Sequence, residues 1–242
     1  MYEEVAARYD EDRERFAIER DELVDELLAS RSSIRVLDLG CGTGRWLAAQ
    51  HEFFEGLAVV WLGVDPSAAM LAEARAKGLA NLALAAAEDL PVAGSSVDLV
   101  SASYCFHHFA DKDRALDEVV RVLAPGGELR IVNIEPTGAE SWWVYEFFPE
   151  TVAIDAARFW APARIAEGVQ ARGLAVDLRL EGGTEEIPAS EALADAERRV
   201  ISELVLLDDA PYEHGLAQLR QHAAKPGATV ATMHARLHVT AR

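Results

Sequence analysis

Five short apolar segments alternate with segments of helical periodicity between residues 34 and 134. One of the helical segments, residues 111–123, is clearly amphipathic and is closed by Pro125-Gly126-Gly127. Strands separated by helices form βαβ units, which build a mostly parallel sheet covered by helices on both faces. The chain is therefore predicted to adopt a doubly wound α/β fold. Its predicted strands are residues 34–39, 57–64, 81–86, 97–102 and 128–134.

The rest of the chain predicts helices before this sheet and a helical insertion before its last strand. Residues 3–29 combine charged residues with good helix formers and predict one or two N-terminal helices. Beyond residue 134 we expect two more strands, seven in all. The predicted elements there are a helix at 162–172, a strand at 174–180, helices at 190–207 and 212–224, and a last strand at 228–240.

The length of the chain favours a single domain. With 242 residues, 50% of them hydrophobic, the chain can bury one substantial core with modest insertions. We therefore expect one domain over residues 1–242. Its parts are an N-terminal helical cap (1–33), the sheet core (34–135), and a segment with the helical insertion and final strands (136–242).

Charge and cysteine content exclude several kinds of partner. The formal net charge of −18 disfavours nucleic acids, since their binding depends on Lys and Arg contacts to phosphates. Cys41 and Cys105 are 64 positions apart and have no metal-ligand spacing around them, so we expect neither a disulfide nor a zinc site. The acidic residues form no recognisable ligand cluster, and no metal is predicted.

No segment has the character of a membrane anchor. The longest apolar runs, such as residues 57–64, are far shorter than the roughly 20 residues that a bilayer crossing needs. Residues 1–12 are acidic rather than a basic and then apolar leader. We expect a cytoplasmic protein without a membrane partner.

A glycine-rich turn, Asp38-Leu39-Gly40-Cys41-Gly42-Thr43-Gly44, joins the first predicted strand to the next helix. Glycines let a ligand approach the backbone closely, and the N-terminus of a helix favours an anion. The dinucleotide fingerprint has a third glycine where this chain has Arg45, which disfavours NAD and FAD. The turn indicates a nucleotide-like ligand, and a purely structural tight turn is the alternative.

Asp65 ends the second predicted strand, 25 residues after Gly40. A carboxylate at this position can accept hydrogen bonds from both hydroxyl groups of a ribose. An aspartate that only shapes the turn before Pro66 is the alternative. Because the glycine turn and Asp65 agree, ribose binding is favoured.

The stretch from residue 34 to residue 135 carries an ordered series of motifs. The motifs are Val36-Leu37-Asp38-Leu39-Gly40-Cys41-Gly42-Thr43-Gly44, Gly63-Val64-Asp65-Pro66-Ser67, Ala87-Glu88-Asp89-Leu90-Pro91, Val97-Asp98-Leu99-Val100 with His107-His108-Phe109, and Arg121-Val122-Leu123-Ala124-Pro125-Gly126-Gly127. This series resembles class I S-adenosylmethionine-dependent methyltransferases, in particular those of ubiquinone and menaquinone biosynthesis. The resemblance implies a Rossmann-like fold, S-adenosylmethionine as cofactor and a methyl-transferring enzyme.

The same resemblance implies how the donor is held. The glycine turn holds the methionine part, Asp38 helps to bind its amino end directly or through water, and Asp65 holds the ribose. The chain departs from the family at Ala86, where Asp or Asn often accepts from the adenine amino group. Adenine recognition then depends on Glu88, Asp89 or the backbone of Ala87 in the loop that follows. The alternative is that Glu88 and Asp89 are solvated loop acids without a ligand. The expected cofactor-binding residues here are Gly40, Cys41, Gly42, Gly44, Asp38, Asp65, Pro66, Ala87, Glu88 and Asp89.

Residues 101–108 follow the fourth predicted strand, at the carboxyl edge where open α/β sheets bind ligands. Ser103 and Tyr104 are predicted to line the donor pocket. His107 or His108 is a candidate general base, because imidazole titrates near neutral pH. A structural role for the histidine pair is the favoured alternative.

Three other segments are candidates for contacts with a ligand or a partner. Tyr2, Tyr9 and Asp10 resemble an element of the family that closes over the donor, and Tyr9 is counted with the cofactor-binding residues. The aromatic residues between 142 and 148 form either a lid over an apolar acceptor or a helix packed on the core. The insertion at residues 182–226 forms a dimer contact or part of the acceptor pocket, and a homodimer is left open.

These features predict methyl transfer from S-adenosylmethionine to oxygen, nitrogen or carbon of a small, partly apolar metabolite. A donor-fold protein with a binding or regulatory role is one alternative. A nicotinamide-dependent oxidoreductase is the other, and the glycine spacing disfavours it.

Overall fold

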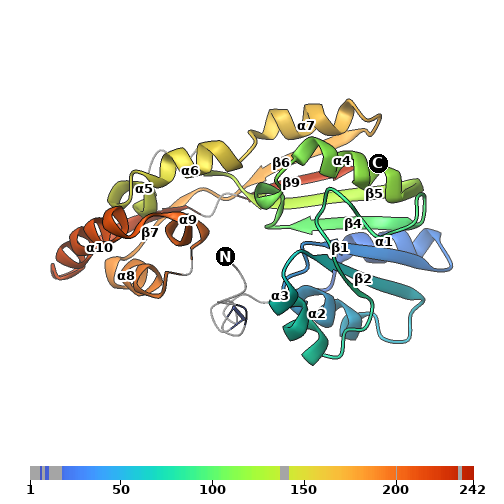
Figure 1. Cartoon of the computed structure of the whole chain (residues 1–242), viewed down its shortest axis with the longest axis horizontal. Coiled ribbons are helices and arrows are strands. Elements are labelled where there is room, and N and C mark those ends of the chain that lie inside the picture. Colours follow the sequence, from blue (N-terminus) through green and yellow to red (C-terminus); the bar gives the residue numbers. More distant parts are fainter. Residues whose placement is uncertain (1–5, 7–8, 11–17, 137–141, 200, 234–235) are drawn as a thin grey trace. The chain divides into compact units, whose positions relative to one another are not determined.

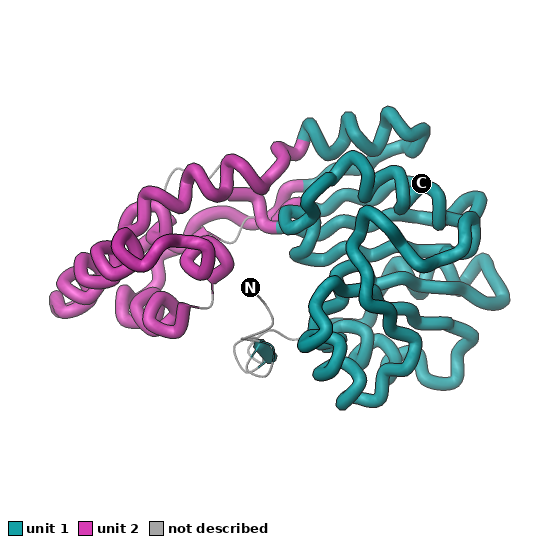
Figure 2. The backbone as a smooth tube through the Cα atoms, in the orientation of Figure 1, with its two compact units in different colours: residues 1–133, 163–179, 238–242 teal, residues 134–162, 180–237 magenta. Residues whose placement is uncertain are grey.

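The structure, a computed structural model, describes residues 6, 9–10, 18–136, 142–199, 201–233 and 236–242. The chain divides into two compact units (Figure 2). The sequence predicts that both units belong to one domain over residues 1–242, and this stays a prediction. The first unit comprises residues 1–133, 163–179 and 238–242, and the second comprises residues 134–162 and 180–237.

One large sheet contains β1 (Ile34–Leu39), β2 (Val59–Asp65), β3 (Leu82–Leu84), β4 (Val97–Ser103), β5 (Leu123–Ile134), β6 (Val176–Glu181) and β9 (Arg236–Ala241). Its strand order is β3-β2-β1-β4-β5-β9-β6 (Figure 1). The pairs β1–β2, β1–β4, β2–β3 and β4–β5 are parallel. Ala175 and Arg242 exchange backbone hydrogen bonds of 2.9 and 3.1 Å, a reciprocal pattern that makes β6 and β9 antiparallel. The predicted seven-stranded, mostly parallel sheet of a Rossmann-like fold is confirmed.

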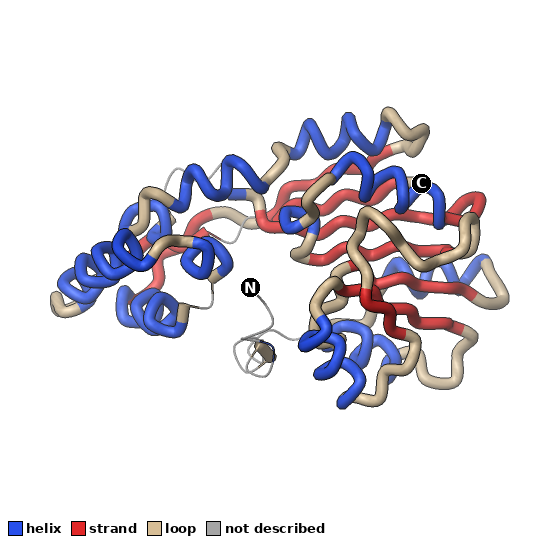
Figure 3. Tube along the Cα trace, in the orientation of Figure 1, coloured by secondary structure: helices blue, strands red, loops and turns tan. Residues whose placement is uncertain are grey.

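The helices of the first unit begin where the sequence supplies capping side chains. Ser67 Oγ accepts from the backbone N–H of Met70 at 3.2 Å, and Asp111 Oδ1 accepts from that of Arg114 at 3.0 Å. These bonds satisfy N–H groups that a helix start leaves without partners. The helices are α1 (Glu22–Ser30), α2 (Arg45–Phe53), α3 (Ala68–Ala76), the short 3₁₀ helix η2 (Phe106–His108), α4 (Lys112–Val122) and α7 (Pro162–Gln170), which starts at the unit boundary. Figure 3 shows them alternating with the strands.

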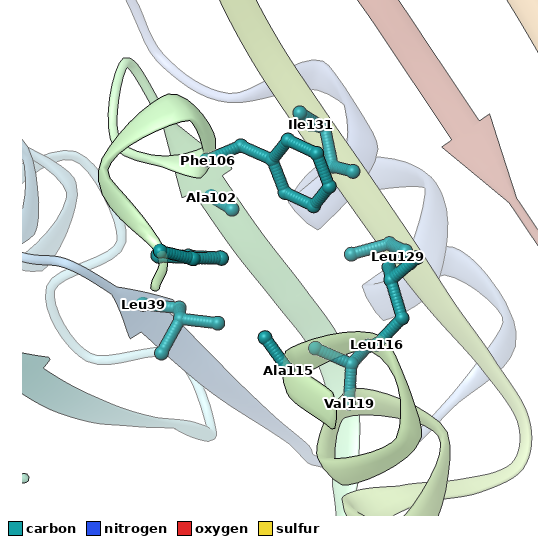
Figure 4. A pocket seen from close by; sticks show the side chains of 9 residues that line it. Leu39, Ala102, Phe106, Ala115, Leu116, Val119, Leu129 and Ile131 are labelled. Carbon is teal, nitrogen blue, oxygen red and sulfur yellow. The ribbon is translucent and has the colours of Figure 1, made fainter. Parts of the chain in front are cut away.

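Strand residues alternate between the two faces of the large sheet. On one face an apolar layer packs against α4 and η2 (Figure 4). On the other face, Val36 and Leu99 belong to a core that includes Val24 and Leu27 of α1 and Leu47 of α2. Helices therefore cover both faces. The layer against α4 contains Leu39, Ala102, Phe106, Phe109, Ala115, Leu116, Val119, Leu129 and Ile131.

The second unit packs helices around a two-stranded antiparallel sheet of β7 (Thr184–Pro188) and β8 (Thr229–Met233). The helices are α5 (Trp143–Phe147), α6 (Thr151–Arg158), α8 (Ala189–Arg198), α9 (Ser202–Leu206) and α10 (Asp209–Ala223). Aromatic and aliphatic side chains make up its core, which includes Trp143, Phe148, Leu204 and Leu216. The insertion predicted as helical lies in this unit and contains α8, α9 and α10, preceded by the short strand β7, which the sequence analysis missed.

Three predicted elements differ from the structure by more than a shift of one to three residues at their ends. The last strand, predicted at residues 228–240, is two strands, β8 and β9, in different sheets. The helix predicted at 190–207 is two helices, because Arg199 has a left-handed φ of +50° at the end of α8. β5 starts at Leu123 rather than at Glu128. Leu123 pairs with Val97 and Glu128 with Leu99, so the chain around Pro125 bulges out of register instead of only ending α4.

Among the helices formed by the described residues, none has the length and apolar character of a membrane span. The cytoplasmic location stays a prediction.

Candidate functional site

The glycine turn lies directly after β1 and leads into α2. Gly40, Gly42 and Gly44 have φ values of +70°, +53° and +71°, in the left-handed region that residues with a Cβ adopt only with strain. The backbone N–H groups of Gly40 and Cys41 donate to Val64 O at 2.7 and 3.0 Å, which fixes the turn to the end of β2. The turn thus forms the N-terminal end of α2, where the helix dipole favours an anion.

The three glycines differ in the space around them. A Cβ on Gly40 would lie 2.6 Å from Cys105 Cβ, and one on Gly44 would lie 2.4 Å from Leu79 Cδ1. A Cβ on Gly42 would meet nothing within 4 Å. Gly40 and Gly44 are needed for close packing inside the protein, whereas the backbone at Gly42 borders open space that a ligand can approach.

Gly42→Ala should therefore lose ligand binding without a collapse of the fold. We expect an unfolding free energy lower by about 1 to 2 kcal/mol, the cost of a left-handed φ with a Cβ. Gly56→Ala is a matched control, because Gly56 also has a positive φ, +77°, and open space around it. Calorimetric titration with S-adenosylhomocysteine should give weaker binding for Gly42→Ala alone. Equal affinities of the two variants would reject a ligand-facing role for Gly42.

Asp65 ends β2 beside the glycine turn and is 8% exposed. Its Oδ2 accepts from Gly42 N at 2.8 Å, and its Oδ1 accepts from Ser67 N at 2.8 Å. The bond to Ser67 is the turn-shaping contact foreseen as the alternative to ribose binding. The two roles are compatible, because each carboxylate oxygen has two lone pairs. Pro66, next in the chain, is exposed.

Asp38 is the penultimate residue of β1 and is buried. Burial raises the pKa of Asp38 to about 8. The positive charge of Arg130 opposes this shift, while the negative charges of Asp65 and Asp21 add to it. The Asp38 carboxyl thus lies in a site where a cationic group would stabilise its ionised form.

The two cysteines near the turn are buried thiols. Cys105 Sγ donates to Leu39 O at 3.0 Å. Burial, together with the carboxylates of Asp38 and Asp65, raises the pKa of both Cys41 and Cys105 above that of a free thiol. Neither has the lowered pKa of a nucleophilic cysteine. Cys41 therefore contributes backbone and packing to the turn.

The predicted adenine loop is tied to the start of α4. Glu88 Oε1 accepts from Asp111 N at 2.9 Å, and Glu88 O accepts from Arg114 Nε at 2.9 Å. The Glu88 carboxylate thus has a structural partner. Asp89 is exposed, and Ala87 is buried. Asp89 and the backbone of Ala87 are therefore the groups of this loop that are best suited to bind an adenine.

Tyr104 follows β4 with a positive φ of +55° and is 46% exposed. Its backbone N–H donates to Val132 O at 2.7 Å, which holds the residue at the carboxyl edge of the sheet. Ser103, the last residue of β4, is half-buried. Both residues lie at the edge where the sequence predicted the donor pocket, and their contact with the donor stays a prediction.

The histidine pair lies in η2. His107 is buried, and its Nδ1 lies 2.9 Å from Asn133 Oδ1 on β5. The rings of His107 and half-buried His108 are 3.9 Å apart between centroids. These contacts give the structural reading of the pair a physical basis, and a catalytic role for either histidine stays a prediction.

Part of the N-terminal segment is anchored on the glycine turn. Asp10 Oδ1 accepts from Thr43 Oγ1 at 2.6 Å, and Asp10 Oδ2 forms an ion pair with Lys77 Nζ at 2.8 Å. Lys77 Nζ also donates to Thr43 O at 2.9 Å. Half-buried Tyr9 precedes Asp10, whereas Tyr2 lies outside the described residues. These contacts agree with a segment that covers the turn.

A polar group around half-buried Arg130 was not predicted from the sequence. Arg130 of β5 forms an ion pair with Asp21 and donates from Nη2 to Ser101 Oγ at 2.9 Å. Asp21 N donates to Gln50 Oε1 at 3.0 Å. The sequence does contain a signal for this group. An arginine in the middle of a strand predicted to be buried needs a polar or charged partner.

The aromatic residues after β5 belong to the core of the second unit. Trp142, Trp143, Phe147 and Phe148 are buried there. The hydroxyl of partly buried Tyr145 donates to Asp155 Oδ2 at 2.9 Å. These contacts are the ones expected of a helix packed on the core, which is one of the two interpretations of this segment. Its role as a lid over an acceptor stays a prediction.

A second buried polar cluster joins three helices of this unit. Arg158 donates to Asp155 Oδ1 at 2.8 Å and to Glu203 Oε1 at 2.9 Å. Burial and the nearby Asp155 raise the pKa of Glu203 to about 7, and Arg158 opposes the shift. Because the Tyr145 hydroxyl of α5 also donates to Asp155, the cluster connects α5, α6 and α9 within this unit.

Among the described residues, no group of three His, Cys, Asp or Glu side chains could hold a metal ion. The expectation of a metal-free site stays a prediction.

Comparison with known proteins identifies the core of the first unit. Residues 36–127 match the family model described as a methyltransferase domain. The demethylmenaquinone methyltransferase of Thermus thermophilus is 36% identical over 145 residues, which are 56% of this chain and 65% of that protein. The ubiquinone/menaquinone biosynthesis C-methyltransferase of Rubrivivax gelatinosus is 32% identical over 154 residues, 61% of this chain and 59% of that protein. The chain thus spans less than two thirds of each relative.

Solved structures share the fold. A methyltransferase described as belonging to an antibiotic biosynthesis pathway of Anabaena variabilis aligns with a TM-score of 0.68 at 19% identity, covering 92% of this chain and 98% of that one. A Haemonchus contortus phosphoethanolamine N-methyltransferase, solved with S-adenosylhomocysteine, aligns with a TM-score of 0.54 at 19% identity, covering 97% of this chain and 52% of that one. Residues 36–127 therefore match a methyltransferase domain and lie in a Rossmann-like fold, and the chain is similar over more than half its length to quinone-biosynthesis methyltransferases.

Proposed function

We propose that the chain transfers a methyl group from S-adenosylmethionine to a small, partly apolar metabolite and releases S-adenosylhomocysteine. The observation that carries the proposal is the pairing of Asp65 with Gly42 at the carboxyl ends of β1 and β2. There a carboxylate suited to ribose hydroxyls stands beside a glycine whose missing Cβ leaves open space. The methyltransferase domain matched at residues 36–127 includes both residues.

In this proposal the donor lies along the turn. Asp65 accepts from the ribose hydroxyls, and Asp38 accepts from the amino group of the methionine part. The backbone of the turn at Gly40 to Gly44 lies against the same part. Asp89 and Ala87 lie beside the adenine, while Ser103 and Tyr104 line the pocket on the β4 side. Asp10, with Tyr9 before it, covers the turn through Thr43 and Lys77.

The residues around the donor mainly orient the reaction. The donor supplies a sulfonium-bound methyl group that is already electrophilic, so the protein must align the acceptor atom in line with the methyl carbon. Orientation of this kind contributes on the order of 7 to 11 kcal/mol to rate enhancement. A general base is needed only for a poorly ionised hydroxyl or ammonium acceptor, and buried His107 is then held in a fixed orientation by Asn133.

The acceptor is proposed to resemble a quinone in chemistry. The matched relatives are named for demethylmenaquinone and for ubiquinone and menaquinone biosynthesis, and both names imply a partly apolar ring compound. The net charge of −18 disfavours a nucleic acid acceptor. The proposal is compatible with methyl transfer to oxygen, nitrogen or carbon. It is also compatible with a homodimer and with a cytoplasmic location.

The proposal is tested by methyl transfer with the full chain. S-adenosylmethionine carrying a labelled methyl group is incubated with the protein and demethylmenaquinone, reduced and oxidised, and with a metabolite extract. We expect label in a small, solvent-extractable product. Donor binding without label in any product would favour the non-catalytic binding role instead.

A further inference from the structure

Asp38 belongs to a row of polar residues that crosses three parallel strands. Asp38 of β1 pairs in register with Ser101 of β4, and Ser101 pairs with Arg130 of β5. Residues opposite each other in neighbouring strands point to the same face of a sheet. Their chain neighbours Leu39, Ala102 and Ile131 point to the α4 face. The polar row therefore lies on the face covered by α1 and α2.

Arg130 is fixed in this row from two sides. Its Nη2 donates to Ser101 Oγ at 2.9 Å, and its Nη1 forms an ion pair with Asp21. Asp21 is itself held, because its Oδ1 accepts from Leu23 N at 3.1 Å at the start of α1. The guanidinium carbon of Arg130 lies 5.4 Å from the centre of the Trp46 ring of α2, within the range of a cation–π contact. A half-buried arginine held in this way is a permanent positive charge at one place.

The positive charge of Arg130 lies in a region with several buried carboxyl groups. Three carboxyl groups, Asp21, Asp38 and Asp65, are each less than one tenth exposed. Among the described residues whose charges act on Asp38, Arg130 alone favours the ionised form. Asp65 at the end of β2 and Asp21 at the start of α1 disfavour it, and the thiols of Cys41 and Cys105 nearby are neutral. The ionisation of Asp38 therefore depends on Arg130.

We propose that Arg130 is a positioning residue for the donor site, favouring the ionised form of Asp38, which accepts from the ammonium group of the donor. The proposal rests on the proposed function, because it takes Asp38 as the group that binds the amino end. Arg130 does not touch the donor itself. It acts through Asp38, while Asp21 and Ser101 keep its guanidinium in place.

The sign of the pH effect follows from this arrangement. A protonated Asp38 must lose its proton before it can accept from an ammonium group, so affinity for S-adenosylhomocysteine rises with pH. The rise levels off above the pKa of Asp38, about 8 in the free protein. The positive charge of Arg130 lowers the pKa of Asp38. Without Arg130 the midpoint should therefore move up, and a shift of about one unit would lower affinity at pH 7 about tenfold.

The experiment compares Arg130→Gln, which is neutral and polar, with Arg130→Lys, which keeps the charge. Calorimetric titrations with S-adenosylhomocysteine run from pH 6 to pH 9 on the full chain, with thermal unfolding measured at each pH. We expect a higher midpoint in the Gln variant and a midpoint near that of the wild type in the Lys variant. An unchanged midpoint in the Gln variant would overturn the proposal, whatever happens to its melting temperature.

Asp38→Asn separates this effect from a structural one. In the Asp38→Asn background the rise with pH should be absent, and adding Arg130→Gln should change affinity by the same factor at every pH. A pH-dependent effect of Arg130→Gln in that background would contradict the proposal, because it would show that Arg130 acts through another group.

A double variant keeps the test valid if Arg130→Gln does not fold. Asp21→Asn with Arg130→Met removes both members of the ion pair, so neither member is left as a charge without its partner. Arg130 acts on Asp38 more strongly than Asp21 does, so the midpoint should still rise. A midpoint at or below that of the wild type would reject the role of Arg130. A wild-type protein that binds no S-adenosylhomocysteine at any pH would instead reject the proposed function, and this role with it.

Discussion

Asp65→Ala should weaken the binding of S-adenosylhomocysteine at least a hundredfold. The substitution removes a carboxylate expected to accept two hydrogen bonds from the ribose, and hydrogen bonds to charged groups contribute about 1.5 to 3 kcal/mol each. Each 1.4 kcal/mol corresponds to about a tenfold change in affinity. The same carboxylate also holds Gly42 N at 2.8 Å, so its loss loosens the turn that faces the donor. Calorimetric titration of both proteins measures the difference.

Asp177→Ala is the matched control for this experiment. Asp177 lies on β6 of the same sheet, and its side chain is 59% exposed in an ion pair with Arg179. The substitution makes the same change of charge and should leave the affinity within a factor of about two, because exposed ion pairs contribute little. Equal affinities of the Asp65→Ala variant and the wild type would contradict the proposed ribose contact. Thermal unfolding distinguishes lost contacts from a lost fold.

Trp143→Ala should lower the free energy of unfolding of the second unit by about 3 to 5 kcal/mol. Trp143 is 2% exposed, and its ring packs edge-on against Phe148 at 6.3 Å between centroids. Removal of the indole leaves a cavity in a core that α5 shares with α8 and α10. The residues of the proposed donor site lie in the first unit, so affinity for S-adenosylhomocysteine should be kept. Denaturant unfolding and calorimetry measure the two effects.

Val152→Ala provides the comparison, since Val152 on α6 is 46% exposed and its truncation should cost less than 1 kcal/mol. If Trp143→Ala left stability unchanged but weakened acceptor binding, the aromatic segment would act as a lid rather than as core. Loss of S-adenosylhomocysteine binding in a stable Trp143→Ala protein would contradict the assignment of the donor site to the first unit.

Local patterns were sufficient for β1 to β5 and the helices between them, because these elements are consecutive along the chain. Each strand from β1 to β5 is followed by a turn or helix whose signals, such as Ser67 and Asp111 at helix starts, lie in the same few residues. The placement of Gly42 beside Asp65 followed from the same order, since parallel strands bring their carboxyl ends to one edge. These parts of the fold and the site could be predicted from the sequence.

The missed features depend on contacts between distant segments. Arg130 is read locally as one charged residue in a strand, and only the register of β1, β4 and β5 places it level with Asp38. In the sequence, Glu88 has the context of a solvated loop acid, and only the fold brings Asp111 N within hydrogen-bond distance of its carboxylate. β8 and β9 have the same alternating pattern, and nothing local indicates that they belong to different sheets.

The aromatic segment is ambiguous for the same reason. Trp142 to Phe148 has the composition of both a core helix and a lid, and its partners on α8, α9 and α10 follow more than forty residues later. Sequence periodicity records that a face is apolar but not what covers it. The packing partners therefore had to come from the structure.

The account depends most directly on the identity of the nucleoside ligand, and one calorimetric comparison tests it. The full chain is titrated with S-adenosylhomocysteine and, separately, with NAD under the same conditions. We predict micromolar binding of S-adenosylhomocysteine and no binding of NAD. Binding of NAD instead, or of neither ligand, would contradict the proposal that this chain is a methyltransferase.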